Sequence, residues 1–341
     1  MNLSPFLVSI RQFSPLVLAL IGAVVAVCAY LQALHYPFIS DDDIYIVHNH
    51  MLAEQHLGQI WPFFVKPYNP AREFLPLRDM SYWFDLTLFG KNPTAFRVHN
   101  ILLYLLCLLF TYGVTSDIWR YFRPADSAGA PWAAGVVTAL FALHPAHAEA
   151  VIWIAGRKDV LSAMFSLLAI WLAVRAGRGP KFSPPLAGAA VLALQAAMLS
   201  KATAFAVAPV IAMLWLVFWL NTPKHDRRPA LLLWALACLI TAMCLALVFG
   251  SATGARIPFY FGLEAAARSL AVLGWLARLS VSPEGRHYFY PVFEDPYLPL
   301  MVALGVAVLA TAITAGVMIL RKRSLTAFAL AVFLLLCVPS M

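Results

Sequence analysis

Long apolar runs separated by short polar segments make up most of the chain. Nine runs can be delimited, and in chain order they are Pro15–Leu34, His99–Ser116, Trp132–Ala146, Val160–Val174, Leu186–Ser200, Ala204–Leu220, Ala230–Gly250, Leu298–Leu320 and Leu325–Val338. A helix that crosses a membrane perpendicularly needs about 20 apolar residues, and several of these runs are shorter. The pattern predicts an all-α polytopic membrane protein, a bundle of about nine transmembrane helices.

The composition agrees with this prediction. Of the residues, 62% are hydrophobic and only 12% are charged, and the mean hydropathy is +0.79. Soluble domains carry about 25% charged residues, so this chain lacks the polar surface to cover itself in water. We therefore expect residues 1–341 to form one transmembrane domain, and we expect the chain to end inside an apolar run at Met341.

The net charge of +8 does not indicate nucleic-acid binding, because the basic residues are dispersed between apolar runs and form no basic face interleaved with aromatics. Basic residues indicate orientation instead, since cytoplasmic loops are enriched in Lys and Arg. With the N-terminus inside, 12 of the 24 Lys and Arg residues fall in inside segments, namely Arg11, Arg120, Arg123, Arg175, Arg178, Lys181, Lys224, Arg227, Arg228, Arg321, Lys322 and Arg323. The other twelve are spread over outside segments about twice as long in total, so basic density favours this orientation.

This orientation puts four segments outside: the first outer loop 35–97, the tip 145–159, the turn around Lys201, and a second large loop 251–297. Nearly every cluster of polar residues that could take part in catalysis or binding lies in one of these four outside segments. A site assembled where several helix ends meet one aqueous surface is the natural expectation.

The stretch 264–282 is apolar enough to suggest another span. Counting it as a span would place the basic residues 321–323 outside, and Arg268 and Arg278 interrupt it. We therefore predict an amphipathic helix that lies on the outer membrane surface.

Three adjacent carboxylates, Asp41, Asp42 and Asp43, follow the first apolar run. Such charges repel one another, which raises at least one pKa unless a cation relieves them. The cluster suits a catalytic base or a ligand set for a divalent cation. The alternative is a solvated acidic cap, but acidic residues contribute little to membrane topology. We therefore favour a functional role for these three carboxylates.

A histidine-rich segment closes the third run. His144, His147 and Glu149 lie within six residues, a density that transition-metal sites also show. Pro145 prevents a regular helical ligand face, so metal binding is the weaker interpretation.

Basic residues near the outer helix ends suit an anionic phosphate. Arg157 and Lys158 begin the fourth run, and Lys201 joins two short ones. A guanidinium binds phosphate well, whereas membrane anchoring would favour the other side. Lys201 alone is equally compatible with snorkelling to the interface. Arg78 and Asp79, in an aromatic segment typical of an interfacial helix, have the simpler alternative of pairing with each other.

Several short motifs occur in a fixed order along the chain: Phe38-x-x-Asp41-Asp42, Pro76-Leu77 with Gly90-x-Asn92-Pro93 and His99-Asn100, His144-Pro145-x-His147-x-Glu149-Ala150-Val151, Gly156-Arg157-x-Asp159, and Leu199-Ser200-Lys201. In this order, they resemble the transmembrane-and-tetratricopeptide family of protein O-mannosyltransferases and their bacterial relatives, within the GT-C class of polytopic glycosyltransferases. The resemblance covers roughly residues 30–210.

The resemblance implies an inverting transfer of a sugar, mannose among the candidates, from a polyprenyl-phosphate carrier to a hydroxyl acceptor at the non-cytoplasmic face. It implies Asp41 or Asp42 as general base. The other roles that it implies are donor-phosphate binding by Arg157 and Lys201 and substrate positioning by His144, His147, Glu149 and Arg78. No cofactor is certain, and a divalent cation at Asp41, Asp42 and Asp43 is the one candidate.

The chain also departs from the family pattern. The frequent Arg-Pro-Leu reads Leu75-Pro76-Leu77 with Arg78 shifted, Ala202 replaces a frequent Glu after Ser200-Lys201, and no tetratricopeptide repeats follow. The expected partners are therefore the lipid-linked donor, membrane lipids, and a protein, lipid or glycan acceptor.

Two other function classes stay open at this point: a transporter or flippase for a lipid or lipid-linked glycan, and a non-catalytic relative acting as an assembly subunit. In a transporter, charges should occur near the membrane midplane, whereas here they gather at one face. The expected location is the bacterial inner membrane in the cell envelope, with a periplasmic site. An endoplasmic reticulum membrane with a luminal site is the alternative.

Overall fold

The computed structural model describes residues 14–54, 60–179, 181–221, 263–281 and 298–322. Within these ranges the regular structure is entirely helical, which confirms the predicted all-α class. The chain divides into two compact units, residues 1–204 with 218–253, and residues 205–217 with 254–341.

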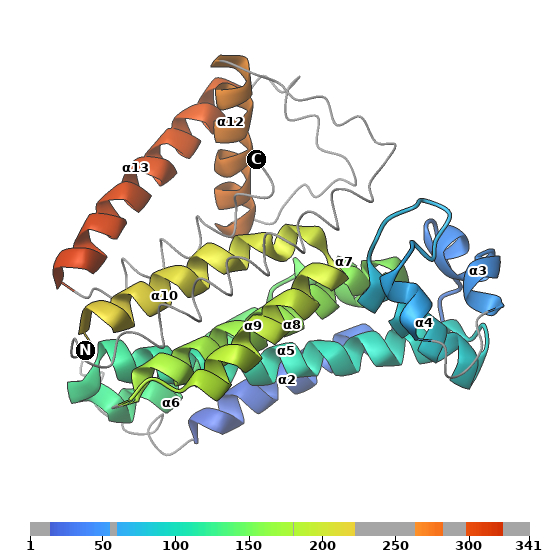
Figure 1. Cartoon of the computed structure of the whole chain (residues 1–341), viewed down its shortest axis with the longest axis horizontal. Helices are drawn as coiled ribbons and strands as arrows, with labels where there is room; N and C mark the ends of the chain where they lie inside the picture. Colours follow the sequence, from blue (N-terminus) through green and yellow to red (C-terminus); the bar gives the residue numbers. More distant parts are fainter. Residues whose placement is uncertain (1–13, 55–59, 180, 222–262, 282–297, 323–341) are drawn as a thin grey trace, which may run out of the picture. The chain divides into compact units, whose positions relative to one another are not determined.

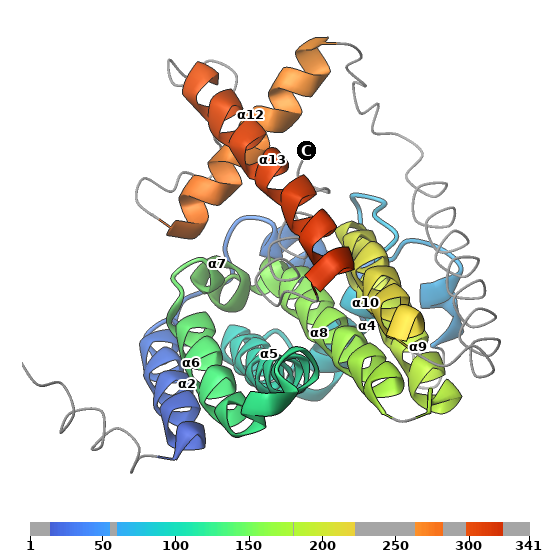
Figure 2. The same ribbon diagram turned by 90° about the vertical axis from the view of Figure 1, so that its left-hand side faces the viewer.

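Five helices form the body of the first unit. They are α2 (Pro15–Leu31), α5 (Pro93–Phe122), α6 (Ala130–Leu143), α8 (Arg157–Arg178) and α9 (Pro184–Ser200). Figure 1 shows them running along a common direction, and Figure 2 shows their order across the unit, α2, α6, α5, α8 and α9. Prolines begin several of them, since the fixed φ of proline suits the first helical turn. The Asn92 side chain caps α5 by accepting a hydrogen bond of 3.1 Å from the Thr94 amide.

Small residues let α2 and α6 approach closely. A Cβ atom at Gly135 would lie 2.3 Å from the Pro15 carbonyl oxygen, and one at Gly22 would lie 2.9 Å from the Ala139 Cα. Glycine at such contacts is typical of helix pairs that pack inside a membrane, where close van der Waals contact replaces hydrophobic driving force.

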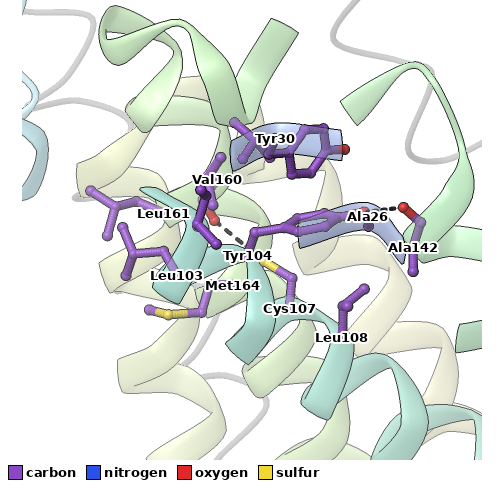
Figure 3. Close-up of a cluster of buried hydrophobic side chains, with 12 residues drawn as sticks. Ala26, Tyr30, Leu103, Tyr104, Cys107, Leu108, Ala142, Val160, Leu161 and Met164 are labelled. Atoms are coloured by element: carbon purple, nitrogen blue, oxygen red, sulfur yellow. Dashed lines mark hydrogen bonds between the residues drawn. The ribbon is translucent and has the colours of Figure 1, made fainter. Parts of the chain in front are cut away.

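The core between α2, α5 and α8 is built around Tyr104. Its ring meets the Tyr30 ring edge-on at 5.7 Å, and its hydroxyl donates to the Ala142 carbonyl at 3.0 Å. Val160 and Met164 from α8 pack in the same cluster (Figure 3). A buried tyrosine needs a hydrogen-bond partner, and here the backbone at the end of α6 supplies it.

Two helices of the described ranges are long and apolar enough to cross a membrane, Pro93–Phe122 and Ile154–Arg178. Shorter apolar helices are Pro15–Leu31, Pro184–Ser200, Ala202–Phe218 and Leu298–Thr311. Between residues 98 and 109, the exposed side chains of α5 are aliphatic, namely Val98, Leu102, Leu106 and Leu109. The bundle of nine transmembrane helices is not confirmed. Two of the nine predicted runs, Ala230–Gly250 and Leu325–Val338, lie outside the described residues.

In the second unit, α12 (Leu263–Val281) and α13 (Leu298–Lys322) cross one another (Figure 2). A Cβ at Gly274 would lie 2.1 Å from the Met301 carbonyl oxygen, and one at Gly305 would lie 2.0 Å from the Leu270 carbonyl oxygen. The helix predicted over 264–282 is therefore present and packs closely on α13. Its position on the membrane surface stays a prediction. The remaining described helix is α10 (Val207–Asn221).

Candidate functional site

An end cap, which we define as residues 35–54, 60–92 and 144–156, gathers at one end of the first unit (Figure 1). It contains a π-helical turn η1 (Asp43–Val47), α3 (His50–Ala53), the 3₁₀ turn η2 (Trp61–Phe64), α4 (Pro76–Phe89), α7 (His147–Ile152) and the 3₁₀ turn η4 (Ile154–Gly156). Tyr45, Phe63, Tyr82 and Ile154 share one buried cluster with Phe96 of α5. Two segments far apart in the sequence therefore form one structure.

Three fully buried arginines, Arg78, Arg97 and Arg157, hold the end cap together. A buried guanidinium without partners would carry a large desolvation penalty, so the partners of each arginine show what it stabilises.

Arg157 begins α8 and ties it to α4 and α5. Its Nε donates to Asn100 Oδ1 at 2.7 Å, and its Nη1 lies 2.6 Å from Asp85 Oδ2. Its remaining N–H groups donate to the Ser81 and Phe96 carbonyls at 3.2 and 2.8 Å. The geometry gives Arg157 a positioning role. The direct contact with a donor phosphate predicted from the sequence would require this network to open.

Arg97, which sequence reasoning missed, joins the beginning of the first outer loop to the end of α7. It donates to the carbonyls of Tyr36 and Pro37, the latter at 2.7 Å, and to the carbonyl of Ile152 at 3.1 Å. The available signal was an arginine in the second turn of a helix that begins at Pro93 and continues as an apolar run. Such a charge needs an internal partner or an aqueous surface.

Arg78 lies at the centre of a third network. Its Nε donates to Asp79 Oδ1 at 2.8 Å, so Arg78 and Asp79 pair with each other, which was one of the alternatives from the sequence. Its Nη1 donates to Glu73 Oε2 at 2.5 Å, and its guanidinium lies 4.4 Å from the centre of the Tyr45 ring. Asn69 Nδ2 donates to the other Asp79 oxygen at 3.0 Å. Arg78 thus contacts both Glu73 and Tyr45, and its own side chain is inaccessible to solvent.

The three adjacent carboxylates have different environments. Asp42 is completely buried, and its two oxygens accept from the Ile39 amide at 3.0 Å and the Ala155 amide at 2.8 Å. Burial raises the pKa of Asp42, although these amides and the Arg97 charge act in the opposite direction. Asp41 is half-buried and Asp43 is exposed. Of the two predicted bases, Asp41 is the accessible one.

Local geometry explains how Asp42 reaches Ala155. Ser40 adopts a positive φ of 52°, a conformation that residues other than glycine seldom take, and this turns the chain before the carboxylates. On the other side, a Cβ at Gly156 would lie 3.0 Å from the Ala150 carbonyl oxygen. The lack of a side chain there lets the turn before α8 pack against α7.

Four charged side chains interact with Tyr45, and together with it they form a group that we call the polar cluster: Asp41, Tyr45, Glu73, Arg78 and Lys158. The Tyr45 hydroxyl donates to Glu73 Oε2 at 3.1 Å, and Lys158 Nζ lies 5.9 Å from the centre of the Tyr45 ring. Burial, with the negative charges of Glu73 and Asp41 adding to it, raises the pKa of Tyr45 to about 12, so its hydroxyl stays protonated. Sequence reasoning did not find Tyr45 or Glu73, since nothing in their spacing connects them to Asp41.

The protonation of Glu73 gives a testable pH dependence. Burial alone would raise its pKa, but the charge and hydrogen bond of Arg78, with help from Lys158 and Tyr45, hold the pKa below its ordinary value. Because the unfolded state then has the higher pKa, the stabilisation is complete above that value and is lost as pH falls through the lower native pKa. We expect Glu73→Gln to abolish this part of the acid-induced loss of thermal stability, measured in detergent between pH 3 and 7. An unchanged pH profile in the variant would contradict the assignment.

The other predicted residues form two smaller groups. The His144 and His147 rings lie 5.7 Å apart, and His147 packs 4.2 Å from the Phe141 ring centre, while Glu149 is exposed on α7. Lys201 forms an ion pair with Asp159. The structure therefore brings Asp41, Arg78 and Lys158 each near Tyr45. It also pairs Lys201 with Asp159, the residue that follows Lys158.

Among the residues that the structure describes, no group of three or more His, Cys, Asp or Glu side chains is arranged to hold a metal ion. The carboxylates of Asp41, Asp42 and Asp43 do not converge, because Asp42 turns both oxygens towards backbone amides. The divalent site considered from the sequence is not assembled in this arrangement.

Comparisons with known proteins agree with the motifs. The chain is 29% identical over 159 residues to the protein O-mannosyl-transferase F38B6.6 of Caenorhabditis elegans, and 31% identical over 159 residues to human protein O-mannosyl-transferase TMTC4. The matches cover 44% and 43% of this chain but only 22% and 21% of the relatives. Mouse TMTC1 is 28% identical over 226 residues, 61% of this chain and 22% of that protein.

The matched part thus spans about a fifth of the length of these curated relatives. No family model and no solved structure matches the chain. The extent and level of identity show that the chain resembles the protein O-mannosyl-transferases of the transmembrane-and-tetratricopeptide family.

Proposed function

We propose that this protein is a membrane glycosyltransferase that moves a sugar, with mannose as first candidate, from a polyprenyl-phosphate carrier to a hydroxyl acceptor. The observation that carries the proposal is a pair of partly exposed, oppositely charged side chains, Asp41 and Lys158, that both interact with Tyr45, in a chain similar to protein O-mannosyl-transferases. A hydroxyl is a poor nucleophile and needs a base, and a leaving phosphate needs positive charge.

The reaction is a single displacement with inversion. The acceptor oxygen attacks the anomeric carbon and its proton passes to Asp41. The bond between that carbon and the phosphate oxygen breaks, and its electron pair leaves with the carrier phosphate. Asp42 holds Asp41 in position through its hydrogen bonds to residues 39 and 155.

Lys158 is the cation best suited to the leaving phosphate. It is half-buried, follows the fully buried Arg157, and lies near Tyr45 and Glu73. Lys201 reaches the same end of α8 through Asp159. The sequence assigned donor-phosphate binding to Arg157. In this proposal Arg157 instead fixes the start of α8, and Lys158 supplies the positive charge for the phosphate. Arg78 positions Glu73, and His144, His147 and Glu149 line the adjacent turn as candidate acceptor contacts.

The spacing of charges along α5 and α8 supports a membrane location. Asp117 follows Asn100 by 17 positions and Arg175 follows Arg157 by 18, which correspond to roughly 26 and 27 Å of helix. The hydrocarbon core of a bilayer is about 30 Å thick. Residues 101–116 and 160–174 between these ends carry no charge, which favours an enzyme with its chemistry at one face over a transporter with charges at the midplane.

We place the end cap on the non-cytoplasmic side, in a bacterial inner membrane with a periplasmic site or in an endoplasmic reticulum membrane with a luminal site. A lipid-linked donor carries its phosphate at headgroup depth, where the end cap would meet it without extracting the lipid. The relatives' names point to a protein acceptor, and a lipid or glycan acceptor is the alternative.

The test is sugar transfer by the purified protein in nanodiscs. The protein is offered radiolabelled polyprenyl-phosphate mannose with a pool of peptide, lipid and glycan acceptors, and labelled product is measured against nanodiscs without protein. We expect labelled acceptor, and the acceptor fraction that carries the label identifies its class. Absence of transfer with this donor and with a panel of other lipid-linked hexoses would refute the proposal in favour of a non-catalytic relative.

A further inference from the structure

A second set of charges lies at the other ends of α5 and α8. We call it the arginine layer: Asp117 and Arg120 from α5, and Trp171, Arg175 and Arg178 from α8. The three arginines and Trp171 surround the Asp117 carboxylate, and the sugar-transfer proposal gives no role to any of these residues.

Asp117 is buried, and its two oxygens are satisfied at short distance by two donors. Arg178 Nη1 donates to Oδ1 at 2.6 Å, and Trp171 Nε1 donates to Oδ2 at 2.9 Å. These two contacts are enough to fix the carboxylate and to join the two helices.

Arg120 and Arg175 approach the same carboxylate from farther away. Arg120 Nη1 lies 3.4 Å from Oδ1, and Arg175 Nε lies 3.6 Å from Oδ2. Their side chains are 44% and 46% exposed, whereas that of Asp117 is 7% exposed. Three arginines around one carboxylate leave a net charge of +2. A guanidinium has five N–H donors, so both exposed arginines keep donors for an outside anion.

The neighbouring aromatic residues indicate where this layer lies. The Arg175 guanidinium stacks 5.1 Å from the centre of the Trp171 ring, and that of Arg123 lies 5.4 Å from the centre of the Trp119 ring. Tryptophan with arginine at the end of an apolar helix is typical of headgroup depth in a membrane. The negative ends of the α5 and α8 dipoles oppose an anion, but arginines in both last turns compensate them.

We propose that Arg120 and Arg175 together bind the phosphate group of an anionic phospholipid in the leaflet at this end of the helices. Because both contact one carboxylate, their guanidiniums lie close enough to share one phosphate diester. Asp117 fixes them from behind, and Trp171 holds the Arg175 side chain. The proposal depends on membrane insertion of α5 and α8 and is independent of sugar transfer.

The experiment is native mass spectrometry of the full chain, released from detergent after incubation with phosphatidylglycerol or phosphatidylcholine. We expect the protein to retain phosphatidylglycerol about tenfold more than phosphatidylcholine, and the Arg120→Gln/Arg175→Gln double variant to lose most of that preference. The double variant keeps the contacts of Arg178 and Trp171 with Asp117, so the helix pair should remain folded.

Arg123→Gln is the matched control. It removes the same charge as Arg175→Gln at the end of α5, next to the arginine layer, but Arg123 does not contact Asp117, so we expect less than about a twofold effect. Arg175→Lys keeps the charge but loses the planar fork, and we expect it to lower retention as well. Equal losses in Arg123→Gln and Arg175→Gln would overturn the proposal in favour of a general basic surface. Displacement of the lipid by millimolar inorganic phosphate would overturn it in favour of a free-phosphate site.

Discussion

Replacing Asp41 with asparagine is expected to lower the rate of sugar transfer by about 10²–10⁴-fold, the usual contribution of a positioned general base. Asp41 is the half-buried one of the three adjacent carboxylates, and asparagine keeps its size while removing its ability to take a proton. The measurement is the initial rate at saturating donor in nanodiscs.

Asp43→Asn is the matched control, since it removes the same charge two residues away from an exposed side chain. We expect its rate to stay within about twofold of the wild type, because a fully solvated charge acts weakly at a distance. Equal losses in the two variants would point to the field of the cluster rather than to a base at Asp41. A wild-type rate in Asp41→Asn would remove Asp41 from the mechanism.

Asp42→Asn separates catalysis from structure at the neighbouring position. Asparagine offers one acceptor oxygen where the Ile39 and Ala155 amides require two. A buried amide without its acceptor is costly, so this variant should lose thermal stability along with activity. Asp41→Asn should lose activity at an unchanged melting temperature.

Replacing Arg157 with methionine is expected to have the largest effect on stability, a loss of about 3–5 kcal/mol. It removes the guanidinium that faces the buried Asp85 carboxylate, which among the described residues then keeps only the His99 ring nitrogen at 2.7 Å. Arg157→Lys should recover little, since one ammonium group cannot reach Asn100, Ser81, Phe96 and Asp85 together. The free energy of unfolding is measured by denaturant titration in mixed micelles.

Lys158→Met provides the control at the next residue. Its side chain is half-buried and makes a distant contact with Tyr45, so its loss should change stability by less than about 1 kcal/mol. We expect the same variant to reduce sugar transfer, because it removes the cation proposed for the leaving phosphate. If Arg157→Met kept wild-type stability and lost only transfer, Arg157 would return to the direct donor contact predicted from the sequence.

Hydrophobic runs located the helices but not their ends. The run beginning at His99 predicted a helix six residues shorter at its start than α5, which begins at Pro93. Arg97 interrupts the hydropathy pattern, yet it lies within the helix because carbonyls of residues 36, 37 and 152 accept its N–H groups. At the other end, Asp117 is helical because Arg178 neutralises it. Hydropathy treats a charge as a boundary, whereas a buried ion pair allows the helix to continue.

The sequence predicted which segments form the candidate site, but it did not predict the role of each residue in them. Asp41 and Asp42 are indistinguishable by composition, and only the amide of Ala155, 113 residues away, removes Asp42 from the surface. Arg157 and Lys158 are likewise adjacent and basic, and long-range packing decides which of them is accessible. Glu73 belongs to the polar cluster because it accepts a hydrogen bond from Arg78, and the spacing of these residues in the sequence does not predict that contact.

The partners of the three buried arginines differ in when they are made during synthesis. Those of Arg78 lie within five residues of it or earlier in the chain, and those of Arg157 all precede it. Arg97, by contrast, needs the carbonyl of Ile152, which is 55 residues further on. At 5–20 residues per second, that partner emerges roughly 3–11 s later. In the proposed membrane topology, the beginning of α5 carries an incompletely paired guanidinium during this interval, and there the nascent chain depends on water or on an assisting protein.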